Sequence, residues 1–223
     1  MNKNEVKTVY VCSECGSVNA KWIGKCPQCN SWNTMVEEVS QKKEKKETGI
    51  FKYKEPLKLS ELNIGNEIRY LSEISEFDRV LGGGIVKGSL VLVGGDPGIG
   101  KSTLLLQMCR TIDEKLKLLY VTGEESANQI KLRANRLNVN SDNLYILTET
   151  EVESITNTII TQKPDLVIID SIQTMHTDIT NSSAGSVSQI RESTSLFMRT
   201  AKEENVPIFL VGHVNKEGSI AGP

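Results

Sequence analysis

The chain has 223 residues, of which 38% are hydrophobic and 24% charged, and its formal net charge is -2. This composition is typical of a soluble globular protein and excludes a wholly disordered one, and the net charge carries no overall nucleic-acid signature. No apolar run approaches the roughly 18 residues of a membrane span. The N-terminus also lacks the apolar stretch of a secretory signal, so we expect a cytoplasmic protein without membrane association.

Four of the five cysteines form two C-x2-C pairs, Cys12-Ser-Glu-Cys15 and Cys26-Pro-Gln-Cys29. Each pair predicts a tight turn that points two thiolates at one centre, and four thiolates form the tetrahedral shell that zinc accepts. Residues 1–39 are too few for a sufficient core, so we expect the metal to supply their folding energy. Iron in a rubredoxin-like site is the main alternative. Disulfides or a redox motif are disfavoured, because the chain reads as cytosolic and neither pair opens a helix of a βαβ unit.

Trp22 and Trp32 flank the second cysteine pair. The favoured interpretation is that they pack the small metal module, and the alternative is that one of them stacks on a base or a partner. Residues 40–56 include a run without apolar side chains, QKKEKKETG, and end at Pro56. This composition predicts a charged linker.

From residue 57 to residue 223, apolar strands alternate with helical patterns. An amphipathic segment at 74–81 leads into a triple-glycine turn. Strands are predicted at 90–94, 118–122, 144–147, 166–170 and 207–212, and helices at 101–115, 126–136, 151–162 and 187–204. The alternation predicts an α/β fold with a mainly parallel sheet, buried on both faces. Ligands of such sheets bind at the carboxyl ends of the strands.

Residues 95–102 read GDPGIGKS and fit the pattern G-x-x-x-x-G-K-[ST], between the first of these strands and a helix. The glycines allow successive backbone amides to face phosphate oxygens, and the helix N-terminus adds its positive end. Lys101 is expected to reach the β- and γ-phosphates and to take part in catalysis, and Ser102 to ligate Mg²⁺. Cys109, on the same helix, is expected to be a small buried apolar residue. The predicted nucleotide-binding residues are Gly95, Asp96, Pro97, Gly98, Ile99, Gly100, Lys101, Ser102 and Thr103.

Polar residues follow three further strands. Asp170 ends a buried strand and suits the magnesium site, acting through water. Glu124 or Glu125 is expected to orient or deprotonate the attacking water, with Glu124 slightly preferred; alternatively, both are first-turn residues stabilised by a helix dipole. His213 is expected either to sense the γ-phosphate or to be an ordinary surface histidine.

Several segments together resemble the bacterial RadA/Sms DNA-repair family, within the RecA-like ATPases. They are the C-x2-C…CP-x-C module, ISEFDRVLGGGIVKGSLVLVGGDPGIGKST, LYVTGEES, LVIIDSIQT, GSVSQIRE and VGHVNKEGSIAGP. The resemblance covers nearly the whole chain. It implies a RecA-like P-loop ATPase fold preceded by a small four-Cys zinc ribbon.

The same resemblance implies a DNA-dependent ATPase of recombinational repair. Such a protein acts on single-stranded and branched DNA, drives branch migration together with the RecA recombinase, and forms hexameric rings. ATP is then the substrate, with Mg²⁺ at the phosphates and structural Zn²⁺ in the ribbon. Residues 174–188 match a DNA-facing loop, expected to be mobile because it is polar and too irregular for a core, or else a plain surface crossover. Lys216 is a further candidate for contact with DNA or nucleotide.

Family members continue with a Lys-Asn-Arg-Phe-Gly motif and a domain resembling the Lon protease, whereas this sequence ends at Pro223. We therefore expect the N-terminal part of a longer protein, one that binds nucleotide, hydrolyses it slowly and does not move DNA. Two alternatives stay open. One is a nucleotide-switched oligomerising module with little turnover, and the other is a clamp whose ribbon binds nucleic acid.

Overall fold

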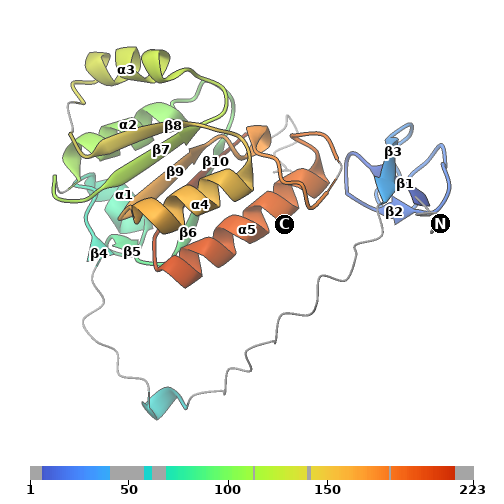
Figure 1. Ribbon diagram of the computed structural model, residues 1–223, viewed down its shortest axis with the longest axis horizontal. Helices are drawn as coiled ribbons and strands as arrows, with labels where there is room; N and C mark the ends of the chain where they lie inside the picture. Colours follow the sequence, from blue (N-terminus) through green and yellow to red (C-terminus); the bar gives the residue numbers. More distant parts are fainter. Residues whose placement is uncertain are drawn as a thin grey trace, which may run out of the picture.

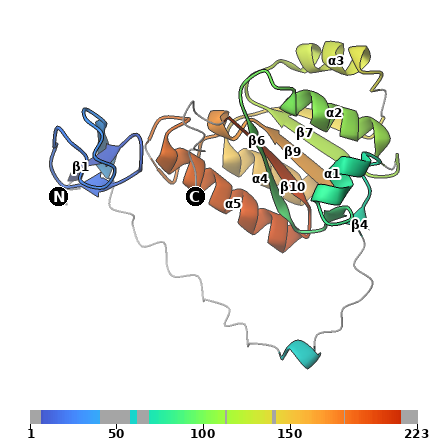
Figure 2. The ribbon, with the colours of Figure 1, turned by 180° about the vertical axis from the view of Figure 1, so that it is seen from behind.

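The computed structural model describes residues 7–40, 58–61, 69–112, 114–139, 142–180 and 182–213. An N-terminal ribbon and a larger α/β unit are separate bodies with their own sheets, as Figures 1 and 2 show from opposite sides. Residues 41–56 of the predicted linker, together with Lys216, lie outside the described residues.

The ribbon is a small antiparallel sheet in the order β2-β1-β3. Its strands are β1 (Lys7–Cys12), β2 (Val18–Asn19) and β3 (Met35–Ser40). The buried residues beneath it are Cys12, Cys26 and Met35, with Tyr10 and Ile23 packed against them. So few apolar side chains cannot stabilise an independent fold, which agrees with a structure held by a metal.

The larger unit contains a sheet that, within the described residues, has five parallel strands in the order β6-β10-β9-β7-β8 (Figure 1). The strands are β6 (Leu90–Gly95), β7 (Leu118–Thr122), β8 (Leu144–Thr148), β9 (Leu166–Asp170) and β10 (Ile208–His213). The helices are α1 (Ser75–Val80), α2 (Lys101–Thr111), α3 (Ala127–Arg136), α4 (Val152–Gln162) and α5 (Val187–Glu204). The shorter elements are η1 (Leu59–Glu61), β4 (Arg69–Tyr70), β5 (Ile85–Val86) and η2 (Ile172–Thr174). The predicted α/β class with a parallel sheet is confirmed.

Two apolar cores lie on opposite faces of this sheet, because successive side chains of a strand point to opposite sides. Leu118 and Tyr120 of β7 belong to the core beneath α2 and α3. Leu119 and Val121 of the same strand belong to the core beneath α4 and α5. Helices therefore cover both faces of the sheet (Figure 1).

The predicted burial of the sheet on both faces is confirmed for the three central strands. The prediction is wrong for the two outer strands, β6 and β8. Every residue of β7 is buried, whereas Leu92 of β6 is 48% exposed and Tyr145 of β8 is 49% exposed. An apolar run in the sequence does not reveal whether its strand lies at an edge, where the helices cover it only in part.

Two helices, α3 and α5, begin at a serine whose side chain caps the first turn. Ser126 and Gln129 form a capping box at the start of α3, and this arrangement satisfies two amides of the first turn. Helix α2 ends at Thr111, earlier than predicted, because Ile112 turns into extended backbone and is buried in the core. Within the described parts of the chain, no helix has the length and apolar character needed to cross a bilayer.

Candidate functional site

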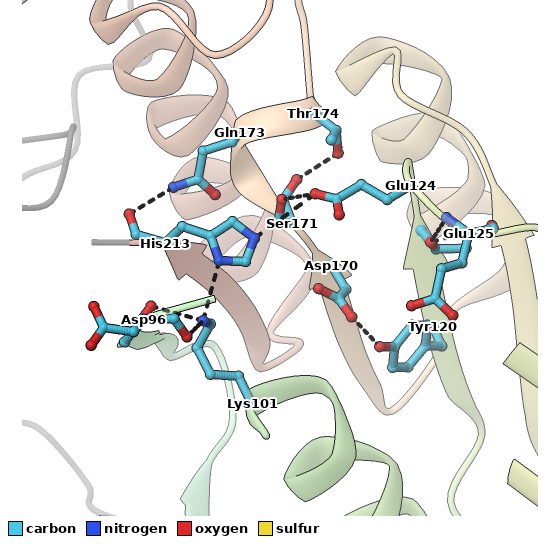
Figure 3. Close-up of polar contacts among 12 residues, drawn as sticks. Asp96, Lys101, Tyr120, Glu124, Glu125, Asp170, Ser171, Gln173, Thr174 and His213 are labelled. Carbon is cyan, nitrogen blue, oxygen red and sulfur yellow. Dashed lines mark hydrogen bonds and ion pairs between the residues drawn. The ribbon is translucent and has the colours of Figure 1, made fainter. Parts of the chain in front are cut away.

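Four strands of the sheet carry polar or glycine residues to one edge (Figure 3). Pairing places His213 opposite Gly95, and Thr122 opposite Asp170. Strand β10 lies between β6 and β9, so it brings the histidine between the phosphate loop and the carboxylate. This edge is where parallel α/β sheets bind their ligands.

The phosphate loop connects β6 to α2. Gly98 and Gly100 have φ angles of 79° and 103°, and no atom lies within 4 Å of a Cβ built at either. Side chains rarely adopt such angles, so glycine lets the loop amides line an open concavity. Ile99 is 69% exposed at the tip, and the Ser102–Thr103 pair lies in the first turn of α2.

Lys101 is held directly over this loop, although it begins a surface helix. Its side chain is buried at 7% exposure, and its Nζ donates hydrogen bonds of 2.8 Å to the carbonyls of Gly95 and Asp96. The same Nζ lies 3.2 Å from Nδ1 of His213. The ammonium group therefore sits where it can meet an anionic ligand of the loop amides.

Asp170 ends β9, and its Oδ2 accepts a hydrogen bond from the phenol of Tyr120 on the neighbouring strand β7. Tyr120 is fully buried. Burial, reinforced by the charge of Asp170, raises the pKa of the Tyr120 phenol well above its ordinary value. The phenol is thus a permanent donor that orients the carboxylate.

The two glutamates after β7 have different surroundings, and only one faces the phosphate loop. Oε1 of Glu124 accepts a 2.9 Å hydrogen bond from Oγ of Ser171 and lies 3.9 Å from Nε2 of His213. Glu125 instead forms an ion pair with Arg133 of α3. Glu124 is therefore available to a ligand at the carboxyl ends of the strands, whereas Glu125 is tied to the last turn of α3 through Arg133.

Gly123 explains how Glu124 comes so close to the end of β9. A Cβ built at Gly123 would lie 2.4 Å from Oγ1 of Thr174, which is too close for any side chain. Thr174 in turn donates a 2.8 Å hydrogen bond to the carbonyl of Ser171. The glycine lets the segments after β7 and β9 approach, and this contact brings Glu124 to Ser171.

Three residues at this end of the sheet were not predicted from the sequence: Tyr120, Ser171 and Gln173. Tyr120 lies inside an apolar strand and reads as a core residue. Gln173 donates a 3.2 Å hydrogen bond to the carbonyl of His213, a contact between segments 40 residues apart. No local pattern marks such partners, because strand order alone brings them together.

The four-cysteine site has the geometry that a tetrahedral metal requires. All four Sγ atoms lie within 4.8 Å of one another, and the Cys12–Cys29 and Cys15–Cys26 pairs are each 3.6 Å apart. A tetrahedron with zinc–sulfur bonds of about 2.3 Å has sulfurs about 3.8 Å apart. The donor set therefore fits a structural zinc ion and has no open position for catalysis.

The favoured interpretation of the two tryptophans is wrong. Trp22 is 57% exposed and Trp32 is 69% exposed, so neither is a core residue of the ribbon. The ribbon interior is filled by the cysteine cluster and Met35 instead. Cys109 behaves as predicted: it is buried beneath the sheet, and burial raises the pKa of its thiol to about 12.

The loop predicted at 174–188 is more firmly packed than its composition suggests. Met175, Thr177 and Ser182 are buried. The side-chain amide nitrogen of buried Gln189 on α5 lies 3.1, 3.1 and 2.9 Å from the carbonyl oxygens of Thr177, Thr180 and Ser182, so its two N–H groups are shared among three acceptors. Its Oε1 accepts from the amide of Thr177 at 2.9 Å. One glutamine thus organises a polar loop into a defined surface.

Comparison with known proteins gives matches over both bodies. Residues 53–219 match a family described as AAA domain, and residues 10–37 match the rubredoxin metal binding domain. A solved structure, a DnaB-like replicative helicase described with its interactions with primase, is similar over 69% of this chain and 45% of its own. The TM-score is 0.56 and the sequence identity 19%, so this likeness concerns the fold alone.

Curated relatives cover nearly all of the chain. DNA repair protein RadA of Listeria monocytogenes is 54% identical over 100% of this chain and 50% of its own length. The RadA proteins of Halalkalibacterium halodurans and Aquifex aeolicus are 53% and 48% identical, each over 49% of their length. The chain thus spans about half the length of these relatives.

A parallel sheet with a phosphate loop at the carboxyl ends of its strands defines the class of P-loop ATPases, here joined to a four-Cys zinc ribbon. The AAA domain match covers most of the chain. The chain belongs to this AAA domain family and, by its relatives, to the bacterial RadA/Sms family, of which it represents the N-terminal part.

Proposed function

We propose that this protein is a DNA-dependent ATPase of recombinational DNA repair, which couples ATP hydrolysis to binding of single-stranded DNA and to branch migration. The observation that carries the ATPase assignment is the convergence of Lys101, Glu124 and Asp170 at one edge of the sheet (Figure 3). The relatives described as DNA repair protein RadA support the repair role. A cytoplasmic location follows from a chromosomal substrate.

In this proposal the phosphate-loop residues, 95–103, bind the triphosphate of ATP through backbone amides. Lys101 exchanges its contacts with the carbonyls of Gly95 and Asp96 for phosphate oxygens and neutralises charge that develops in the transition state. Ser102 and Asp170 would hold Mg²⁺, which supplies further charge neutralisation when bound.

Glu124 orients the attacking water in this scheme and accepts its proton. Ser171 keeps one carboxylate oxygen in place through its 2.9 Å hydrogen bond. His213 lies 3.2 Å from Lys101 and 3.9 Å from Glu124, so it can sense the γ-phosphate between them. Its backbone carbonyl is bonded to Gln173, next to the start of the 174–188 loop, which provides a direct route from nucleotide to loop.

We assign DNA contact to the 174–188 loop, whose polar surface is organised by Gln189. The zinc ribbon is a structural module in this assignment. The RecA recombinase as partner, and a hexameric ring with nucleotide between subunits, are carried over from the family resemblance as parts of the same proposal.

The test is steady-state ATP hydrolysis of the chain with and without single-stranded DNA, beside the Lys101→Ala variant. The proposal predicts slow turnover that DNA stimulates only weakly in this chain and that Lys101→Ala abolishes; vigorous stimulation would show that the further part of the family's chain is dispensable. Tight nucleotide binding with no turnover under either condition would instead indicate a nucleotide-switched module. A rate that survives Lys101→Ala would overturn the assignment of the phosphate loop.

A further inference from the structure

The ribbon presents two tryptophans side by side on its surface. Trp22 and Trp32 are 57% and 69% exposed. A Cβ built at Gly24 would lie 3.7 Å from Cη2 of Trp22 and 3.8 Å from Cζ3 of Trp32, so both indoles contact the same glycine. Because Gly24 has no side chain, the two rings flank one open position on the ribbon surface, and we call this pair of indoles the indole platform.

The platform contributes little to folding. The ribbon interior consists of Cys12, Cys26 and Met35, with neither tryptophan among the residues packed against them. Exposure of two large aromatic groups together is costly in water and marks a surface that meets a ligand. The fold therefore leaves the indoles free for binding.

The charge around the platform favours an anionic ligand. Nζ of Lys25 lies 5.7 Å from the centroid of the Trp32 ring, and Lys25 pairs with Trp32 across an isolated antiparallel bridge. The sequence from residue 16 to residue 34 contains Lys21 and Lys25 and no Asp or Glu. Aromatic faces beside lysines are the chemistry that holds the bases and phosphates of single strands.

The platform also belongs to a ribbon that touches the candidate DNA loop. A Cβ built at Gly16, in the first cysteine knuckle, would lie 3.3 Å from Nη1 of Arg191 and 3.5 Å from Cγ1 of Val187. Val187 begins α5 and belongs to the end of the 174–188 segment, and Figure 2 shows the ribbon beside this end of the helix. A DNA strand bound by the 174–188 loop would therefore lie close to the ribbon.

We propose that the indole platform of Trp22 and Trp32, with the Lys25 ammonium over one face of Trp32, is a base-stacking site for single-stranded nucleic acid. This inference rests on the proposed DNA-binding function and adds a second contact to it. Stacking needs only the flat face of a base, so the site holds strands without reading their sequence. The ribbon is then a binding module as well as a metal-stabilised one.

The tryptophans report on the site directly, because Trp22 and Trp32 are the only two in the chain. The experiment titrates the whole chain with a thymidine oligonucleotide and with an abasic oligonucleotide of equal length, following tryptophan emission and affinity. We expect quenching and tighter binding with the thymidine strand. Equal affinity for both strands with unchanged emission overturns the proposal, because phosphate contacts alone would then explain binding.

Variants separate stacking from structure. Trp22→Ala and Trp32→Ala are each expected to weaken binding of the thymidine strand by roughly 5- to 150-fold, whereas the Phe variants keep most of the affinity. Val36→Ala is the matched control, since Val36 is a 53% exposed apolar residue on β3. Metal content of each variant verifies that the ribbon is folded.

The outcomes distinguish this inference from the proposed function. If DNA binds and stimulates ATP hydrolysis while all tryptophan variants keep full affinity, the platform is not a DNA site and this inference is overturned. If DNA neither binds nor stimulates hydrolysis, the proposed function itself is wrong. Loss of affinity in the alanine variants alone supports the inference.

Discussion

Tyr120 and Asp170 are joined by a hydrogen bond across neighbouring strands, from the phenol to the carboxylate. Tyr120 pairs with Ile168 in the sheet, so Asp170 lies two residues further along the partner strand and on the same face. The phenol therefore bonds to one carboxylate oxygen of Asp170. The other oxygen stays available to a ligand at the carboxyl ends of the strands. Tyr120, which the sequence pattern predicts to be a core residue, thus orients the Asp170 carboxylate at the candidate site.

Tyr120→Phe removes this donor while keeping the ring. Because Oδ2 of Asp170 loses its partner, we expect the free energy of unfolding to fall by about 1–3 kcal/mol. We also expect ATP hydrolysis to need more Mg²⁺ for half-maximal rate, since the carboxylate is less well oriented. Urea unfolding and a Mg²⁺ titration of the rate measure the two effects.

The control is Tyr145→Phe, on the adjacent edge strand β8, where the phenol is half-exposed. It is expected to change neither quantity. An unaltered Mg²⁺ dependence in Tyr120→Phe would mean that the hydrogen bond stabilises the fold but does not position the metal ligand.

Glu124→Gln and Glu125→Gln are expected to have different effects. The first removes the carboxylate that faces the ligand edge, so hydrolysis should fall by about 100- to 10,000-fold while nucleotide binding persists. The second breaks the ion pair between Glu125 and Arg133, whose two side chains are only 26% and 25% exposed. Glu125→Gln should therefore lower the free energy of unfolding while changing the rate of hydrolysis little. Single-turnover hydrolysis, nucleotide affinity and thermal unfolding compare the two.

A double-mutant cycle with Arg133→Ala adds a control for this pair. Glu125 should couple to Arg133 in unfolding free energy, and Glu124 should not. If Glu125→Gln stops hydrolysis and Glu124→Gln does not, the two roles must be exchanged.

Gln189→Leu should release the 174–188 loop. Three carbonyls lose the amide that satisfies them, so the unfolding free energy should fall by about 1–3 kcal/mol. Limited proteolysis should become faster within the loop, and stimulation of hydrolysis by DNA should decrease more than the basal rate. Gln107→Leu, at an exposed position of α2, is the comparison. Equal stimulation in both variants would remove the loop from the DNA surface.

Metal removal should unfold the ribbon and leave the larger unit intact. The ribbon has its own small core, separate from the two cores of the sheet, and binding of a structural zinc supplies folding energy of order 10 kcal/mol. A chelator, or Cys26→Ser, should change tryptophan emission while the helical circular dichroism persists. Cys109→Ala should keep the metal, because this thiol lies beneath the sheet. Loss of both signals together would show that the bodies depend on each other.

Much of the fold was accessible to sequence reasoning because its signals are local. The strand β9 was predicted with its observed bounds, and α5 likewise, since apolar periodicity and Ser186 at the N-cap act over a few residues. The loop residues 95–102 carry a spacing that only a phosphate loop needs. The predictions that Leu92 and Trp32 are buried were wrong, because the exposure of a side chain depends on neighbours that are distant in the sequence.

By itself the sequence determined the five strands of the larger sheet, the helices between them, a phosphate loop and a four-thiolate site, because each depends on short-range spacing and conformational preference. Only the tertiary structure decided that β10 lies between β6 and β9, which sets His213 beside Lys101. Only it distinguished Glu124, bonded to Ser171, from Glu125, paired with Arg133. The physical reason is that strand order and helix docking are settled by burial of whole faces, to which every distant segment contributes.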